Sequence, residues 1–497
     1  MPTTRDDFLR WFVLSLALLT LALAAPVSAL TQSAGLDGRW NVSVEGASRS
    51  GIITLVLSTQ GTQVRGERDV DGEAMVPVTG EIQDDRVTLH FIVWENDQEL
   101  PIEITARLTQ SRLDGEAVIV LPNGRRVARR WTALRSAAPR AEATDRDIPV
   151  GSLADVLRVT LQRTGWPGIT VAWRRADGTS GAEAAGFADL ESRSPMTITS
   201  RMPAGSVGKT FVSAVTLLMA SEGLVNLDAP VSEVLGDLPW FNDVPNGADL
   251  TLRFLLQHSG GLPDHVDDLD FARMSETLFA NPDQPASPEE LIATLANNEP
   301  LFAAGQGYAY SDTGYLLIGL VLEEVTDRSW WELLHQRALQ PAGLEHSYAQ
   351  NRRDFQSLAT GYPDVDGTRD MPAAIVADGV LVVHPATEWT GGGVVSTSPD
   401  LARWASILYG GEFLPEAAFA EMITSRAPGS GYGLGVREAT SDWGIMWGHD
   451  GWFPGYRTKL AFFPGHELAV AIQVNTDRNV DLTRLLVDVL ALLEPID

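Results

Sequence analysis

Met202-Pro203-Ala204-Gly205-Ser206-Val207-Gly208-Lys209-Thr210 places a serine three residues before a lysine, in the pattern S-x-x-K. Lysine is rare in this chain: Lys209 and Lys459 are the only two, and every other basic side chain of the 37 Lys and Arg residues is arginine. Arginine does not release its proton in a protein, whereas a lysine shielded from water can. The choice of lysine at position 209 therefore indicates proton chemistry.

The residues after Ser206 predict a helix from Val207 to Glu222. Its apolar residues fall on one stripe, and Gly223 follows as the capping residue. Ser206 then lies at the helix start, where the free N–H groups favour developing negative charge, and Lys209 rises on the same face. Burial would lower the pKa of Lys209 and let it accept the serine proton. The alternative is that Ser206 only caps the helix and that Lys209 lies on the surface.

Length and composition narrow the class of protein. A chain of 497 residues predicts at least two domains. The net charge of −28 argues against nucleic acid and anionic lipid as partners. With no cysteine, a disulfide scaffold, a thiolate zinc site and a cysteine nucleophile are excluded. The eight histidines show no H-x-x-x-H spacing, so we expect no metal and no other cofactor.

The N-terminus predicts export. Arg5 and Arg10 precede the apolar run Trp11 to Ala25, and small residues end the segment at Ala29. This pattern predicts a signal peptide at residues 1–29, with an uncleaved anchor as the alternative. No other stretch is apolar enough to span a membrane, so we expect a periplasmic or secreted protein without an integral membrane span after signal removal.

Residues 35–135 predict an all-β domain. Eight short alternating segments are separated by turn signals such as Asp37-Gly38, which favours an antiparallel closed barrel or a sandwich. Trp40 and Trp131 are expected in its core. Residues 136–148 are small and charged and predict a linker.

Residues 149–497 predict an α+β domain. Strands at both ends of this part enclose a long helical middle, and helices at Leu153–Arg163 and Val480–Leu493 are expected on one face of the sheet. The acidic run Asp264 to Asp270 predicts a solvated loop, and His258 in the preceding turn is expected to be structural.

Two further motifs follow in order. Tyr310-Ser311-Asp312 precedes a predicted helix at Leu316–Val325, and His449-Asp450-Gly451-Trp452 leads into a late strand. Together with S-x-x-K, this series resembles the three motifs of the penicillin-recognising serine hydrolases. The resemblance is to the group of class C β-lactamases, D,D-carboxypeptidases, D-aminopeptidases and family VIII esterases, and it covers about Pro149 to the C-terminus. It implies an antiparallel sheet flanked by helices, with an all-α region.

The resemblance also implies roles for individual residues. Ser206 would be the acylated nucleophile, and Lys209 and Tyr310 would share proton transfer, with the Tyr310 phenolate favoured by the nearby lysine. Backbone N–H groups of Ser206 and Trp452 would form the oxyanion hole. His449 and Gly451 would lie on the strand that binds the substrate.

Three positions depart from the family's usual pattern. Asp312 stands where an asparagine that contacts the substrate is usual, and a carboxylate accepts hydrogen bonds but does not donate them. It would weaken binding of the substrate's acyl-amide carbonyl unless it is protonated or paired with Lys209. His449 stands where lysine is usual, and we expect it to be partly charged and to hold a substrate carboxylate weakly. Trp452 stands where a small residue is common and would narrow the site.

These departures favour an exported serine hydrolase acting on a small-molecule or peptide acyl substrate: an ester, an amide or a D-amino-acid peptide. The alternatives are a D,D-peptidase or β-lactamase acting on cell-wall peptides or β-lactams, and a non-catalytic binding protein that uses its β-domain. The oligomeric state stays open.

Overall fold

The computed structural model describes residues 36–44, 53–70, 76–95, 98–109, 112–120, 126–135, 151–296, 298–363, 372–424, 426–427, 430–478 and 480–494. The predicted signal peptide at residues 1–29 and the predicted linker at residues 136–148 lie outside these ranges. Within them, no helix is long and apolar enough to cross a membrane.

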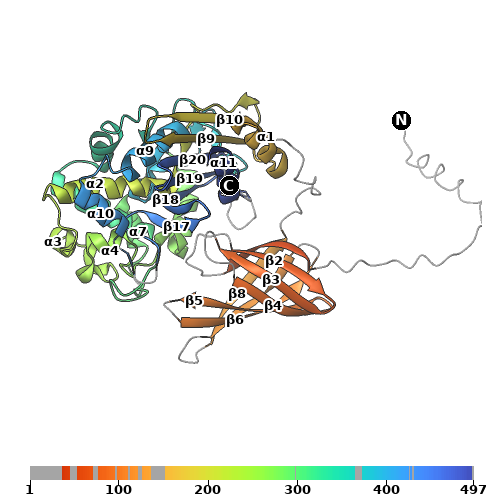
Figure 1. Cartoon of the computed structure of the whole chain (residues 1–497). Coiled ribbons are helices and arrows are strands. Elements are labelled where there is room, and N and C mark those ends of the chain that lie inside the picture. The colour runs from red at the N-terminus through yellow and green to blue at the C-terminus, as the bar shows by residue number, and fades with distance from the viewer. Residues whose placement is uncertain are drawn as a thin grey trace, which may run out of the picture.

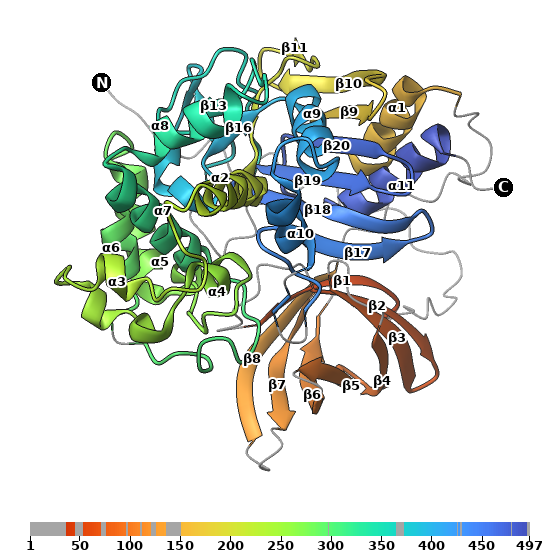
Figure 2. The same cartoon turned by 60° about the vertical axis from the view of Figure 1, so that its left-hand side comes forward.

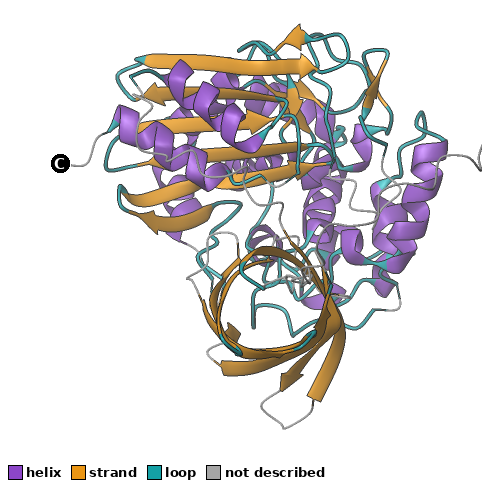
Figure 3. Ribbon diagram, turned by 90° about the vertical axis from the view of Figure 1, so that its right-hand side faces the viewer, coloured by secondary structure: helices purple, strands orange, loops and turns teal. Residues whose placement is uncertain are grey.

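The N-terminal part consists of antiparallel β-strands, as predicted. Each strand pairs with the next, and β8 also pairs with β1, so that the sheet closes on itself; Figure 3 shows the ring of strands end-on. Side chains alternate along each strand, and the inward set forms a hydrophobic core that includes Trp40 and Trp131. The strands are β1 (Gly38–Val44), β2 (Ile53–Gln60), β3 (Gln63–Val70), β4 (Val76–Gln83), β5 (Arg86–Glu95), β6 (Gln98–Leu108), β7 (Arg112–Val120) and β8 (Arg126–Arg135).

The C-terminal part is built on a seven-stranded sheet of order β11-β10-β9-β20-β19-β18-β17. Its strands come from both ends of this part of the chain and meet where β9 pairs antiparallel with β20. The strands are β9 (Gly168–Arg175), β10 (Ser180–Asp189), β11 (Ser194–Pro195), β17 (Arg437–Ser441), β18 (Gly444–Phe453), β19 (Tyr456–Phe463) and β20 (Leu468–Val474). The prediction of an antiparallel sheet with helices is confirmed.

Helices cover both faces of this sheet. Every residue of β20 is buried, which requires cover on both sides. Successive residues of β19 face opposite layers: Phe463 packs with α1 (Leu153–Thr164) and α11 (Leu482–Leu493), as predicted for the terminal helices. Phe462 packs with α9 (Ser398–Tyr409) and the helical region beyond it, an arrangement that can be followed in Figure 2.

The helical region lies between β10 and β17 in sequence and surrounds α2 (Figure 1). Nearly every residue of α2 is buried, because α7, α8 and α10 all pack against it. The helices of this region are α2 (Lys209–Ser221), α3 (Ser232–Leu235), α4 (Leu252–Leu256), α5 (Leu269–Ala280), α6 (Pro288–Ala293), α7 (Asp312–Thr326), α8 (Trp330–Leu334) and α10 (Glu416–Thr424). Short strands β12 (Met202–Pro203), β16 (Val394–Ser396) and β13 (Tyr348–Ala349) form a second, small sheet beside it.

Candidate active site

Ser206 lies in a 3₁₀ turn, Gly205–Gly208, that precedes α2. The helix predicted from Val207 therefore begins later, at Lys209. The reason is that the turn containing Ser206 packs against the backbone of two other segments of the chain. A Cβ atom on Gly205, which has φ +55°, would lie 2.5 Å from the Trp452 nitrogen, and one on Gly208 would lie 1.8 Å from the Gly392 carbonyl oxygen. Only glycine permits both approaches.

Lys209 is fully buried, with 0% of its surface exposed, so the surface alternative is wrong. Its Nζ donates a hydrogen bond of 3.0 Å to Ser206 Oγ. It also donates to the Gly391 carbonyl oxygen and forms an ion pair with the Asp312 carboxylate. The structure thus brings the serine and the lysine of S-x-x-K into direct contact and adds Asp312 to them.

Asp312 is the first residue of α7, which begins one turn earlier than the predicted helix at Leu316. Its backbone nitrogen donates to Asp264 Oδ2 at 3.1 Å. Only 10% of the Asp264 side chain is exposed, and the prediction of a solvated loop from Asp264 is wrong because this carboxyl group accepts a hydrogen bond from a backbone N–H at the start of α7. Burial, and then the charge of Asp312, raises the pKa of Asp264 well above its usual range.

The Tyr310 ring faces Lys209, whose Nζ lies 5.0 Å from the ring centroid. Its hydroxyl is buried. Burial, and then the charge of Asp312, raises the pKa of Tyr310 well above 10, and the contact with the Ser206 hydroxyl opposes this only in part. The expectation of a favoured phenolate is therefore wrong, because burial and the nearby carboxylate act against a second negative charge. Tyr310 is a neutral phenol.

His449 lies on β18 with both ring nitrogens engaged. Its Nδ1 is 2.6 Å from the Asp450 carbonyl oxygen, and its Nε2 is 2.7 Å from the Tyr432 hydroxyl. Burial, and then the charge of Lys209, lowers the pKa of His449 to about 3. The expectation of a partly charged histidine is wrong, because a dry site beside a cation disfavours the imidazolium.

Gly451 and Trp452 place the end of β18 against the Ser206 turn. A Cβ atom on Gly451 would lie 1.9 Å from the Ala204 carbonyl oxygen, so the two backbones are in contact. The Trp452 indole donates to Asp477 Oδ2 at 2.8 Å, which fixes the ring. The chain's second lysine, Lys459, forms an ion pair of 2.7 Å with Asp450 across the β18–β19 ladder.

Two aromatic side chains, His258 and Tyr432, complete the wall of the site. The His258 ring lies 4.1 Å from that of Tyr310, and its Nδ1 accepts from the Ser311 nitrogen at 3.2 Å, which agrees with its expected structural role. Tyr432 lies 4.7 Å from the same histidine ring. Burial, and then the charge of Lys209, lowers the pKa of His258 well below its ordinary value.

Sequence reasoning missed two charged residues near the site. Arg437 lies on β17 opposite Gly448, with electrostatic contacts to Tyr308 and Asp450, and its buried Nε makes no hydrogen bond within the described ranges. Glu388 accepts a 2.7 Å hydrogen bond from Gln350. Burial raises the pKa of Glu388 to about 7, although the charge of Lys209 opposes the shift. Arg437 and Glu388 are single residues outside any motif, so the spacing of motifs in the sequence could not identify them.

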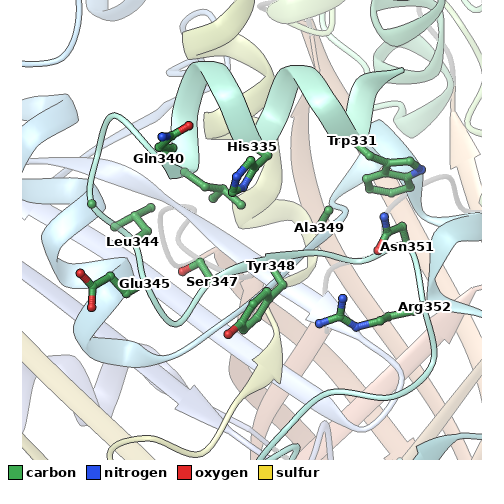
Figure 4. Close-up of a pocket in the computed structure, with 12 residues that line it drawn as sticks. Trp331, His335, Gln340, Leu344, Glu345, Ser347, Tyr348, Ala349, Asn351 and Arg352 are labelled. Carbon is green, nitrogen blue, oxygen red and sulfur yellow. The ribbon is translucent and has the colours of Figure 1, made fainter. Parts of the chain in front are cut away.

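A cavity of about 490 Å³ lies beside α8 and the π-helical turn His335–Leu339. Trp331, Tyr348 and Arg352 are among its lining residues, and Figure 4 shows them around it. None of the predicted site residues lines this cavity. Across the part of the chain that the structure describes, no group of three or more His, Asp or Glu side chains is arranged to hold a metal ion.

Comparison with known proteins identifies related sequences and folds. Penicillin-binding protein 4* of Bacillus subtilis (strain 168) is 24% identical over 311 residues, which are 60% of this chain and 65% of the relative. A D-aminopeptidase of Brucella anthropi is 26% identical over 317 residues, 62% of this chain and 56% of the relative. The chain therefore spans less than two thirds of the length of these two relatives.

Solved structures share the fold of about two thirds of the chain. A D-stereospecific amidohydrolase from a Streptomyces species superimposes with a TM-score of 0.57 at 25% identity, covering 67% of this chain and 95% of the other. A penicillin-binding protein from Bacillus halodurans does so with a TM-score of 0.56 at 22% identity, covering 68% and 99%. The family model described as Beta-lactamase matches residues 103–493, which is more than half of the chain. The chain therefore belongs to the Beta-lactamase family.

Proposed function

We propose that this protein is an exported serine hydrolase that forms an acyl-enzyme on Ser206. The observation that carries the proposal is the 3.0 Å hydrogen bond between the fully buried Lys209 Nζ and Ser206 Oγ. A serine hydroxyl is a weak nucleophile on its own and needs a neighbouring group that takes its proton. Lys209 is in contact with that hydroxyl and is linked to Asp312 behind it.

The proposed reaction uses the groups around Ser206 in turn. Ser206 Oγ bonds to the substrate carbonyl carbon. At the same time the Ser206 hydroxyl loses its proton to Lys209 and the groups in contact with it. Backbone N–H groups of Ser206 and Trp452 stabilise the oxyanion, a role supported by the close approach of Gly205 to the Trp452 backbone. Tyr310, held as a phenol, donates a proton to the leaving group. Water then hydrolyses the Ser206 ester: its oxygen bonds to the acyl carbon and one of its protons restores the Tyr310 phenol. The proton held on the Lys209 side returns to Ser206 Oγ as the ester bond breaks.

The proposed substrates are esters, amides or D-amino-acid peptides. A neutral His449 with both nitrogens engaged supports a leaving group that carries no carboxylate, because the residue offers neither a charge nor a free donor. D-amino-acid amides fit this description. The names D-aminopeptidase and D-stereospecific amidohydrolase among the related proteins point to the same class.

A D,D-peptidase or a β-lactamase is the second candidate, and Arg437 favours it. Its guanidinium lies near Tyr308, Tyr310 and Tyr432, and its Nε has no hydrogen bond within the described ranges. Arginine binds carboxylates through paired N–H groups. Arg437 would therefore anchor the terminal carboxylate of a peptide or a β-lactam that His449 does not hold.

Ser206→Ala tests the nucleophile, and Ser221→Ala is the matched control, because Ser221 is an exposed serine at the end of α2, the helix that follows Ser206. Both proteins are assayed with p-nitrophenyl esters, D-amino-acid amides, acyl-D-Ala-D-Ala peptides and penicillin, and labelled with a fluorophosphonate read by intact mass. We expect loss of turnover and of the adduct in Ser206→Ala only. Undiminished turnover in that variant would end the proposal and favour the binding role of the β-region.

The proposal includes the predicted organisation of the chain: a signal peptide at residues 1–29, a β-domain at 35–135, a linker at 136–148 and the hydrolase domain at 149–497. Expression of the full chain in a Gram-negative host followed by N-terminal sequencing tests the first of these. We expect the protein in the periplasmic or secreted fraction with Leu30 as its first residue. A protein that keeps Met1 and sediments with membranes would contradict export in soluble form.

A further inference from the structure

We propose that Asp312 is the final acceptor of the Ser206 proton during acylation, through a relay from Ser206 to Lys209 to Asp312. This deepens the proposed function and rests on it. The relay assigns Asp312 a catalytic role in place of the substrate contact expected from the sequence. It also gives a physical reason for a carboxylate at a position where the related motif has an amide.

The three contacts of Lys209 Nζ carry the inference. Its neighbours are Ser206 Oγ, the Gly391 carbonyl oxygen and the Asp312 carboxylate. An ammonium has three N–H donors and no lone pair. Ser206 Oγ and the Gly391 carbonyl oxygen accept hydrogen bonds from this 0% exposed side chain, and the Asp312 carboxylate is its third neighbour, in an ion pair. In the relay, the resting group is an ammonium paired with that carboxylate. Such a group takes a proton from Ser206 only if it gives one away.

Asp312 is the neighbour that can receive that proton. As the Oγ–carbon bond forms, the Oγ–H bond of Ser206 breaks and its proton moves to Nζ. At the same time the proton that Nζ directs at Asp312 passes to the carboxylate. Lys209 keeps three protons throughout, and Asp312 becomes a neutral carboxylic acid. The Gly391 carbonyl is not basic enough for this role.

The surroundings of Asp312 suit a group that gains and loses a proton. Its side chain is 22% exposed, which gives the proton a path to solvent that Lys209 lacks. The carboxyl next to it, Asp264, has a raised pKa from burial and then from Asp312 itself, so Asp264 adds little repulsion as a neutral acid. The other titratable groups that face the pair are Tyr310, Tyr315, His258, His265, His449 and Glu388.

Glu388 must be replaced by a residue that does not titrate before the pH dependence of kcat/KM can report on Asp312. The reason is that the pKa of Glu388, about 7, falls within the pH range of the measurement. The experiment therefore compares Glu388→Gln with the double variant Glu388→Gln/Asp312→Asn. The readout is the pH profile of kcat/KM with the best ester or amide substrate. Labelling by a fluorophosphonate confirms in each protein that Ser206 reacts.

The relay predicts that the acid limb moves to higher pH in the double variant. With Asp312, activity is lost only when a carboxylate takes up a proton; with asparagine, Lys209 itself must first lose a proton to solvent. Because carboxyl and amine pKa values are far apart, the shift should exceed about 1 pH unit. An active double variant with an unmoved acid limb would overturn the relay while leaving the Ser206 acyl-enzyme intact.

A second measurement needs no change at Asp312. The rate of acylation of the Glu388→Gln protein is measured in mixtures of H₂O and D₂O. Two protons in flight give a curved dependence on the deuterium fraction, whereas transfer of one proton to Lys209 alone gives a straight line. A straight line would overturn the relay, and absent labelling of Ser206 would instead count against the proposed function.

Discussion

The hydroxyl of Tyr432 lies 2.7 Å from Nε2 of His449, on the side of the ring opposite the Asp450 carbonyl oxygen. A carbonyl oxygen only accepts hydrogen bonds, so Nδ1 carries the imidazole proton and Nε2 accepts from Tyr432. The tyrosine thereby fixes one neutral tautomer. His449 is a structural member of the site wall, and a protonated imidazole would lose the bond from Tyr432.

Acid should therefore destabilise the protein through His449. The unfolded histidine takes up a proton near its ordinary pKa of 6.5, but the folded one does so only near pH 3. Protons thus favour the unfolded chain, and stability falls as the pH falls from 6.5 towards 3, by at most about 4 kcal/mol from this residue. His449→Gln should flatten this slope, because glutamine does not take up a proton in this pH range. The glutamine side-chain oxygen can still accept the hydrogen bond from Tyr432.

Calorimetric unfolding between pH 7 and pH 4 measures that slope. His90→Gln is the control, since His90 is an exposed histidine on β5 and its loss should leave the pH dependence unchanged. An equal pH dependence in wild type and His449→Gln would show that the buried imidazole does not oppose protonation.

Tyr310→Phe should lower kcat/KM by about 10²-fold or more without lowering stability. The buried Tyr310 hydroxyl has no hydrogen-bond partner of normal geometry within the described ranges, so its removal leaves no group unsatisfied. Tyr409→Phe is a matched control, because the Tyr409 hydroxyl is also buried without a hydrogen-bond partner among the described residues but lies on α9. Steady-state kinetics and the Tm of both variants test this. A Tyr310→Phe protein with full activity would remove Tyr310 from the chemistry.

The S-x-x-K spacing was enough to predict the contact between Ser206 and Lys209, because the two residues are one helical turn apart and their contact is local. The antiparallel β-strands were predictable for the same reason, since alternation and turns are local signals. The ion pair between Lys209 and Asp312 entered only as one of two alternatives for the carboxylate, because residues so far apart in sequence meet only through the packing of α2 on α7.

Protonation states were the least predictable feature. From the sequence, Lys209 is a cation near the phenol of Tyr310. A nearby positive charge stabilises the phenolate, so the phenolate was expected. In the folded site, burial and Asp312 dominate, and the pKa of Tyr310 moves the other way. Asp264 was misjudged because a run of acids indicates solvent exposure, and nothing local reveals that one of them accepts a hydrogen bond from the start of α7 and is only 10% exposed.

Arg437→Gln should separate the two candidate substrate classes. If Arg437 anchors a substrate carboxylate, the variant should raise KM for acyl-D-Ala-D-Ala peptides by about tenfold or more, since charged hydrogen bonds contribute roughly 1.5–3 kcal/mol. D-amino-acid amides, which lack that carboxylate, should keep their KM. Arg426→Gln is the control, because Arg426 pairs instead with Glu438 at 2.8 Å. Equal effects on both substrates would remove Arg437 as a carboxylate anchor.

Gly208→Ala should reduce both stability and activity, because the glycine allows two backbones to touch. The new Cβ would lie 1.8 Å from the Gly392 oxygen and 2.3 Å from its carbonyl carbon, and backbone atoms cannot rotate away as a side chain would. Overpacking of this kind costs about 1–3 kcal/mol. The strain would displace the segment whose Gly391 carbonyl accepts from Lys209, so kcat should fall together with Tm. Gly465→Ala, with no atom within 4 Å of the new Cβ, should change neither quantity. If Gly208→Ala matched this control in melting temperature and turnover, the contact between the Ser206 turn and the glycine segment would not be what positions Lys209.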